Sequence, residues 1–461
     1  MIGTQVTDNI LPENEELSFE DFRSIIISDY KIAFESRQAS LLGRREVLTG
    51  KAKFGIFGDG KEVAQLAMAK AFKAGDWRSG YYRDQTFMLA AGMLTLPEFF
   101  AQLYANTNTD ADPGSGGRQM NCHFATRLLD ENGNWMDNTK TKNSSADISP
   151  TGGQMGRLVG LALSSKLYRN NPELEYLKNF SVNGNEVAFG TIGNASTSEG
   201  IFFESINAAG VLQIPMAISI WDDAYGISVP AQYQTTKQDI SEILKGFQRD
   251  EKGEGYEIFK VRGWDYPGLC ETYEKAIKIC RDQHIPVMIH VTEMTQPQGH
   301  STSGSHERYK DKARIAWENE YDCMLQMRKW MIESAIATEE ELNEIQITAK
   351  SYIRDCQKKA WADFNSLMKL ELDSVVELIH STNDQELIKT ANALKESVDP
   401  SRKDVTALVR HALRMLRSEH SEAKQQLQSW YQQQHDSNFE RYNSKLFTGS
   451  SQSPLHIKAI L

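Results

Sequence analysis

Short apolar runs alternate with longer amphipathic stretches along the first two thirds of the chain. Residues 186–192 (EVAFGTI) and 216–221 (MAISIW) are rich in Val, Ile and aromatic residues, as expected of strands that are buried on both faces. Between them, apolar residues from Ile201 to Leu212 recur at roughly helical spacing, and Pro215 marks the entry to the second strand. A strand, a helix and a strand of this length predict parallel neighbours joined by a right-handed crossover.

The same alternation predicts the rest of the main domain. Helical spacing extends from Phe19 to about Leu48, and another helix (VAQLAMAKAF) follows a glycine-rich turn at residues 55–60. Helices and short apolar strands continue to alternate up to about Val291, which predicts a doubly wound, mostly parallel α/β sheet. Two polar stretches are predicted to be exposed loops, residues 104–118 and residues 127–147.

The pattern changes after about Lys310. From there to Tyr442 almost every stretch is amphipathic at helical spacing, and glycine is absent between Gly304 and Gly449. This favours an all-helical extension and excludes further α/β units with tight turns. A polar patch followed by an apolar ending suggests the hypothesis that the chain is the front part of a longer fused protein. The predicted regions are a flexible N-terminus (1–18), the α/β domain (19–310), the helical extension (311–445) and a linker-like C-terminus (446–461).

Composition narrows the class of protein. The 461 residues carry a formal net charge of −11, which argues against nucleic acid as the main partner. No run approaches the ~18 apolar residues of a membrane span, and the acidic N-terminus lacks the apolar core of a secretion signal. The cysteines are scattered and odd in number, so we expect core-filling thiols in a reducing cytoplasm. They are Cys122, Cys270, Cys280, Cys323 and Cys356.

Oxygen-rich turns follow both strands of the predicted strand–helix–strand unit. Gly193 ends the first strand and Asn194 follows it, whereas Asp222 and Asp223 end the second. Ligands of parallel sheets bind beyond the carboxyl ends of the strands, with phosphates at helix N-termini. Amide, carboxylate and backbone carbonyl oxygens are the ligands that magnesium prefers. Either side chain alone could be an ordinary turn former, but the pair favours a site for a hard cation and a diphosphate.

The segment from Glu186 to Pro230 resembles the thiamine-diphosphate motif, in which a Gly-Asp-Gly turn is followed one strand later by Asn-Asn. It is most similar to the alpha part of the first, decarboxylating component of 2-oxoacid dehydrogenase complexes. The helix start Ser198–Gly200 and the turn Tyr225–Ser228 carry this resemblance. Over about residues 30–320, the resemblance implies a thiamine-diphosphate-binding fold.

The chain departs from the general motif in an orderly way. Asn194 stands in place of the usual acid, Ala195 in place of the following glycine, and Asp222-Asp223 in place of Asn-Asn. Acid and amide have exchanged places, so the pair keeps one negative charge. Trp221 stands where branched-chain members have an arginine for the phosphate. The resemblance implies thiamine diphosphate and Mg²⁺ as cofactors, with the metal ligands Asn194, Asp223 and the carbonyl of Tyr225.

Further motifs agree with the resemblance in their order along the chain. Tyr82 and Arg83 match a Tyr-Arg pair that contacts the cofactor diphosphate, a task that suits the planar fork of arginine. The stretch GGRQMNCHF keeps the GRQM-x-x-H pattern of branched-chain members, which implies that His123 faces the substrate. Ser149 and Thr151 match positions in a segment that resembles the loop receiving the aminopyrimidine ring in relatives. Taken alone, each of these side chains is more ordinarily structural or exposed.

The glycine-broken loop QGHSTSGSH, residues 298–306, holds the remaining motif. By resemblance, His300 is the active-site histidine, and Ser301 lies in the loop that kinases regulate in some relatives. A positioned histidine can stabilise developing charge and shuttle protons near neutral pH. The implied catalytic residues are His300 and His123. The implied cofactor-binding residues are Tyr82, Arg83, Ser149, Thr151, Gly193, Asn194, Ala195, Ser196, Asp223 and His300.

The resemblance implies oxidative decarboxylation of a 2-oxo acid and acyl transfer to a lipoyl group, and the HSTS spelling favours the branched-chain type. In relatives, a separate beta part supplies a glutamate that activates the aminopyrimidine, and no beta-like domain follows residue 310. We therefore expect two partners, a lipoyl-bearing acyltransferase and a beta part that is either fused or a second chain of an α₂β₂ assembly.

Other classes remain open. Pyruvate and acetoin dehydrogenases would carry similar motifs, whereas the GRQM-x-x-H and GHSTS segments weigh against a transketolase-like enzyme. A non-catalytic scaffold with the same fold would explain the exchange of Asn194 and Asp223. A nicotinamide-binding domain is disfavoured, because no glycine turn has the full GxGxxG pattern with an acid for the ribose.

Overall fold

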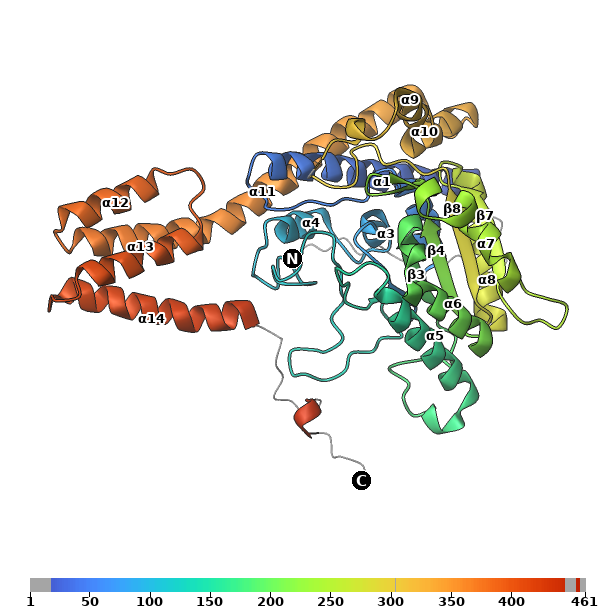
Figure 1. Ribbon diagram of the computed structural model, residues 1–461, viewed down its shortest axis with the longest axis horizontal. Coiled ribbons are helices and arrows are strands. Elements are labelled where there is room, and N and C mark those ends of the chain that lie inside the picture. Colours follow the sequence, from blue (N-terminus) through green and yellow to red (C-terminus); the bar gives the residue numbers. More distant parts are fainter. Residues whose placement is uncertain (1–17, 303, 444–452, 457–461) are drawn as a thin grey trace.

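The computed structural model describes residues 18–302, 304–443 and 453–456 (Figure 1). The predicted flexible N-terminus and most of the predicted linker-like C-terminus lie outside the described residues.

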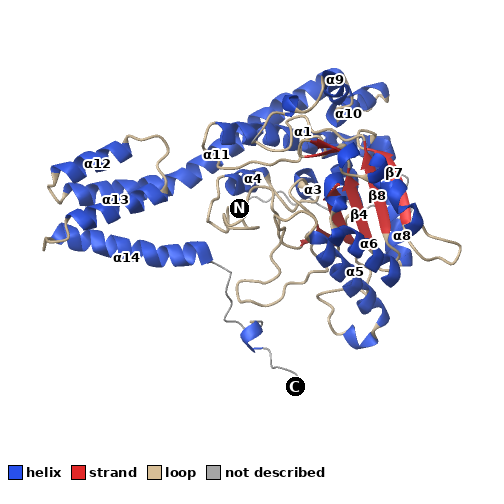
Figure 2. Cartoon of the chain, in the orientation of Figure 1, coloured by secondary structure: helices blue, strands red, loops and turns tan. Residues whose placement is uncertain are grey.

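A six-stranded parallel sheet forms the centre of the main domain (Figure 2). Every neighbouring pair of its strands is parallel. The strands, in their order across the sheet, are β2 (Asn143–Ser144), β1 (Trp77–Ser79), β3 (Ala188–Gly193), β4 (Met216–Trp221), β8 (Val287–Thr292) and β7 (Glu257–Arg262). The two strands expected from EVAFGTI and MAISIW are β3 and β4, and they are parallel neighbours as predicted.

Helices cover both faces of the sheet, so the predicted doubly wound architecture is confirmed. Alternate residues of β4 point to opposite faces, as the period of two in a strand requires. Ile218 and Ile220 pack into a buried cluster with α5 (Gln154–Asn170) and α6 (Gly200–Leu212). Ala217 and Trp221 pack into the larger cluster on the other face. That face is covered by α1 (Phe19–Leu48), α2 (Glu62–Ala71), α3 (Gln85–Ala90), α4 (Leu96–Leu103) and α8 (Tyr266–Gln283).

Short elements complete this domain. A two-stranded antiparallel ribbon is made by β5 (Tyr225–Gly226) and β6 (Val229–Pro230), and one further α-helix is α7 (Ile240–Ile243). The short 3-10 helices are η1 (Pro172–Leu174), η2 (Asn194–Ser198), η3 (Ala231–Tyr233), η4 (Thr236–Gln238), η5 (Leu244–Phe247), η6 (His306–Arg308) and η7 (Pro454–His456).

The predicted helical extension is confirmed for the described residues after 310, none of which lies in a strand. Its longest helix begins at a capping box, in which Thr338 and Glu341 satisfy each other's backbone amides. The first half of this helix packs on α1 and α4, and its second half builds a separate apolar cluster with the last three helices. These last helices project from the α/β domain (Figure 1). The helices are α9 (Lys312–Glu320), α10 (Cys323–Glu333), α11 (Glu339–His380), α12 (Gln385–Lys395), α13 (Arg402–Met415) and α14 (Glu422–Asn443).

One loop prediction is wrong in part. Residues 127–147 were expected to be exposed, but Asn143 and Ser144 are buried and form β2 at the sheet edge. Two polar residues carry no hydrophobic period, so this strand has no signal in the sequence. Asp147 is also buried, because Arg78 binds it at 3.0 Å.

The remaining expectations concern cysteines and membrane spans. All five cysteines are free, and all except the half-buried Cys270 are buried, which confirms the prediction of core-filling thiols. Within the described part of the chain, no helix is both long enough and apolar enough to cross a bilayer.

Candidate functional site

Five neighbouring strands deliver the predicted site residues to one edge of the sheet. Tyr82 and Arg83 follow β1, Asn194 follows β3, and Asp223 follows β4. The same rule holds for the two flanking strands, since Ser149 and Thr151 follow β2 and His300 follows β8. Because parallel strands end at the same edge, motifs far apart in the sequence meet there.

A cleft of about 410 Å³ lies at this edge. All the predicted site residues line it except His123, whose ring neighbours that of Tyr82, and Ser149, which contacts His123. Lys61 and Trp221 line it as well. The indole of Trp221 is buried and donates to Asp84 at 3.3 Å, so its polar atom is already used within the protein.

The turn after β3 presents a buried amide. Asn194 begins the helix η2, and its backbone carbonyl accepts a hydrogen bond from the Thr197 hydroxyl at 2.6 Å. Its Nδ2 atom is buried and has no hydrogen-bond partner among the described residues. A buried donor without a partner costs about 1–3 kcal/mol, so this amide is suited to an acceptor that comes with a ligand.

The two aspartates after β4 point in different directions. One oxygen of Asp222 lies 2.9 Å from Nε2 of the buried His290, and the other accepts from the backbone amide of Ala224 at 2.8 Å. Asp223 instead lines the cleft, where it accepts from the backbone amide of Tyr225 at 3.1 Å. The carboxylate of Asp222 therefore points into the protein and away from the cleft.

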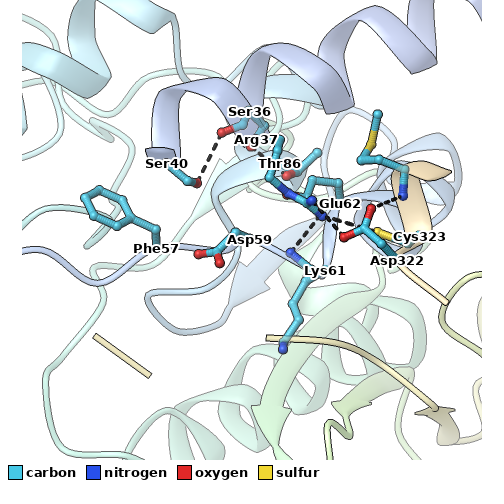
Figure 3. A network of polar contacts seen from close by, with 12 residues as sticks. Ser36, Arg37, Ser40, Phe57, Asp59, Lys61, Glu62, Thr86, Asp322 and Cys323 are labelled. Carbon is cyan, nitrogen blue, oxygen red and sulfur yellow. Dashed lines mark hydrogen bonds and ion pairs between the residues drawn. The ribbon is translucent and has the colours of Figure 1, made fainter. Parts of the chain in front are cut away.

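Lys61 is a site residue that sequence reasoning missed. It precedes α2, is almost fully buried, and donates to Asp223 at 2.8 Å. The start of α2 is anchored by a network in which Arg37 binds both Glu62 and Asp322, and Lys61 extends away from this network (Figure 3). The only signal in the sequence was the glycine-rich turn before Lys61, which says nothing of a partner so distant along the chain.

Charges nearby keep Asp223 ionised. Burial alone would raise the pKa of this carboxyl, but the Lys61 ammonium and the Arg83 guanidinium hold the pKa below its ordinary value. Arg314 adds a hydrogen bond of 2.8 Å to the backbone carbonyl of Asp223. Lys61 and Arg314 thus hold the turn after β4 by hydrogen bonds, and Arg83 adds its positive charge nearby.

Arg83 ties the turn after β1 to the loop after β8. Its guanidinium donates to the carbonyl of Phe57 at 2.6 Å, to the carbonyl of His300 at 2.9 Å and to Nδ1 of His300 at 3.0 Å. Since an arginine only donates, Nδ1 must accept, and the proton of the neutral ring lies on Nε2. Burial lowers the pKa of His300, and Arg83 lowers it further, to about 4. The lowered pKa favours a neutral ring near pH 7, with its Nε2–H as a donor in the cleft.

His123 carries the opposite tautomer. Its Nδ1 lies 3.2 Å from the backbone carbonyl of Asn121, which can only accept, so Nδ1 of the neutral ring holds the proton. Its Nε2 then accepts from the Ser149 hydroxyl at 3.3 Å. The ring of Tyr82 neighbours both histidines, with centroid distances of 6.2 Å to His123 and 6.4 Å to His300. The Thr151 hydroxyl, which also lines the cleft, donates to Glu199 at 2.7 Å.

The fold and the cleft define a doubly wound α/β protein with a cleft at the carboxyl ends of its parallel strands, where such proteins bind ligands. The family model described as "Dehydrogenase E1 component" matches residues 36–366, well over half of the chain. The chain therefore belongs to the dehydrogenase E1 component family.

Curated relatives agree with this assignment at low identity. The 2-oxoisovalerate dehydrogenase subunit alpha of Bacillus subtilis (strain 168) is 26% identical over 293 residues, which cover 63% of this chain and 77% of the relative. The mitochondrial 2-oxoisovalerate dehydrogenase subunit alpha 1 of Arabidopsis thaliana is 24% identical over 350 residues, 75% of this chain and 63% of that protein. The pyruvate dehydrogenase E1 component subunit alpha of Rickettsia felis (strain ATCC VR-1525 / URRWXCal2) is 22% identical over 302 residues, 65% of this chain and 79% of the relative.

Proposed function

We propose that this chain is the alpha part of the thiamine-diphosphate-dependent first component of a 2-oxoacid dehydrogenase complex. It catalyses the oxidative decarboxylation of a 2-oxo acid and passes the acyl group to the lipoyl group of an acyltransferase component. The observation that carries the proposal is the meeting of Arg83, Asn194, Asp223 and His300 in one cleft at the carboxyl edge of the sheet.

The residues of the cleft fit an anionic cofactor. The guanidinium of Arg83 faces a diphosphate with positive charge, and the unpartnered Nδ2 of Asn194 offers it a donor. The ammonium of Lys61 compensates the charge of Asp223 beside it. Within the described part of the chain, no cluster of three or more His, Cys, Asp or Glu is placed to hold a metal. A magnesium ion would therefore rely on the mixed oxygen set of Asn194, Asp223 and the Tyr225 carbonyl, which is chemistry that Mg²⁺ accepts.

When bound, thiamine diphosphate supplies the electron sink for loss of carbon dioxide from the 2-oxo acid. The chain's own residues bind and orient the cofactor and the substrate. Nε2–H of His300 is a neutral donor for negative charge that develops on the substrate oxygen. The Tyr82 ring, which neighbours both histidines, lines the cleft, and the Ser149 hydroxyl keeps Nε2 of His123 oriented.

The proposed substrate type rests on two short sequence motifs. The GRQM-x-x-H pattern around His123 and the HSTS sequence at His300 support a branched-chain 2-oxo acid as substrate. The partners proposed are a beta part, in an α₂β₂ assembly or as a fused half, and a lipoyl-bearing acyltransferase. The free thiols support a cytoplasmic location.

The test is reconstitution with a beta part and a lipoyl domain. Carbon dioxide release and lipoyl acylation should require thiamine diphosphate and be fastest with a branched-chain 2-oxo acid. Asp223→Ala should weaken magnesium-dependent cofactor binding, and His300→Ala should keep binding but reduce acylation. If the reconstituted wild type binds no thiamine diphosphate at all, with or without magnesium, the chain is a non-catalytic scaffold instead.

A further inference from the structure

A buried ammonium group lies directly against the carboxylate proposed as a metal ligand. The Lys61 side chain is about 1% exposed, and its Nζ lies 2.8 Å from Oδ2 of Asp223. The same Nζ donates to the carbonyl of Thr295 at 2.6 Å and to the side-chain oxygen of Gln296 at 3.0 Å. All three N–H bonds of the ammonium are thus used, and its position is fixed before any ligand binds.

This ammonium changes the charge of the proposed ligand set. The amide of Asn194 and the carbonyl of Tyr225 are neutral, so Asp223 brings the only formal charge among the three ligands. Lys61 cancels that charge from inside the protein at 2.8 Å. A diphosphate in the cleft would therefore meet a turn without net charge and the guanidinium of Arg83, even when no metal ion is bound.

We propose that Lys61 is a built-in cation of the diphosphate site, a positioning residue that acts through Asp223 and makes thiamine diphosphate binding only weakly dependent on magnesium. The inference rests on the proposed function. Lys61 has no free N–H for the cofactor, so its effect comes from holding and neutralising Asp223. Without it, a buried carboxylate would repel the diphosphate unless a divalent cation stood between them.

The experiment is isothermal titration of the full chain, with its beta part, by thiamine diphosphate in magnesium and in EDTA. The readout is the ratio of the two dissociation constants, EDTA over magnesium. For the wild type we expect a ratio below about 10, and for Lys61→Met a ratio at least about tenfold larger, because the carboxylate then needs the metal. Lys166→Met is the matched control, since that ammonium bonds the Leu212 carbonyl outside the cleft, and it should keep the wild-type ratio.

Two further variants guard against a folding defect. In Lys61→Met/Asp223→Asn both charges are gone, so magnesium gains little and the ratio should fall to near one. In Asp223→Asn the ammonium remains uncompensated, and binding in EDTA should be at least as tight as in the wild type. If Lys61→Met does not fold, the Asp223→Asn comparison decides the question.

The outcomes are distinguishable. An unchanged ratio in folded Lys61→Met, or loss of binding in EDTA by Asp223→Asn, overturns the role of Lys61. A wild type that binds only with magnesium also overturns it. Absence of thiamine diphosphate binding by every form in both buffers overturns the proposed function itself.

Discussion

Arg83 and His300 are 217 residues apart in the chain, yet one guanidinium nitrogen binds both the ring Nδ1 and the backbone carbonyl of this histidine. The contact joins the turn after β1 to the loop after β8, the strands on either side of β3 and β4. It fixes the tautomer of His300 and keeps the ring neutral at the same time.

Replacing Arg83 by lysine should uncouple these two segments. A single ammonium cannot reproduce the fork that reaches Phe57 and both atoms of His300, and charged hydrogen bonds contribute about 1.5–3 kcal/mol each. We expect thiamine diphosphate affinity to fall about 10- to 100-fold, measured by calorimetry, with little change in the far-ultraviolet circular dichroism. Wild-type affinity in Arg83→Lys would show that the fork is not needed for the cofactor.

The lowered pKa of His300 predicts a specific acid sensitivity. The unfolded ring takes its proton near its ordinary pKa of 6.5, whereas the folded ring takes it only near about 4. The unfolded state therefore binds more protons between these values, and this contribution to stability, present above 6.5, is lost as the pH falls toward 4. The melting temperature should drop more in the wild type than in His300→Gln between about pH 7 and about pH 5. Equal drops would refute the shift, as would an NMR titration of His300 centred near 6.5.

Arg78 should stabilise the folded protein through its two buried ion pairs. It is fully buried in β1 and pairs with Asp84 at 2.6 Å and with Asp147 at 3.0 Å. Arg78→Met would leave two buried carboxylates without compensation, and we expect a loss of about 3–5 kcal/mol in the free energy of unfolding by urea. The matched control is Arg262→Met, where the ion pair with Glu293 is exposed, and its cost should stay below about 1 kcal/mol. Similar losses in both variants would contradict the assignment.

Much of this arrangement could be predicted from the sequence, because it follows from strong local patterns. Continuous apolar runs identify β3 and β4, helical spacing identifies α1 with its observed ends, and the parallel crossover follows from their order. Asn194 and Asp223 were predicted as candidate ligands for the same reason, because they come directly after these two strands. The other candidate site residues were predicted from the family resemblance.

The features that the sequence did not predict depend on contacts between segments that are distant along the chain. The polar strand β2 exists because β1 pairs with it and Arg78 draws Asp147 inward, and neither cause leaves a local pattern. The ammonium of Lys61 could not be assigned to Asp223 from spacing alone. The depressed pKa of His300 likewise comes from burial and from Arg83, which a motif does not encode.

Gly60 should not tolerate a larger residue, because its backbone is left-handed and because a neighbouring carbonyl occupies the place of a side chain. Gly60 has φ +85°, and a Cβ atom there would lie 2.1 Å from the carbonyl oxygen of Thr295, the same atom that binds Lys61. Gly50 also has φ +85° but has nothing within 4 Å of a Cβ position. Gly50→Ala should cost only the strain of a left-handed residue, about 1–2 kcal/mol in chemical unfolding. Gly60→Ala should cost more and should also weaken thiamine diphosphate binding, and equal effects of the two changes would argue against the close contact.

The central claim is that the cleft between the ends of β1, β3, β4 and β8 holds the diphosphate of thiamine diphosphate. A crystal structure of the chain with thiamine diphosphate, Mg²⁺ and its beta part tests it most directly. The account predicts diphosphate density between Arg83, Asn194 and the turn at Asp223, with Nε2 of His300 facing the thiazolium side. Cofactor bound elsewhere, or a cleft that stays empty at saturating cofactor, would contradict the account.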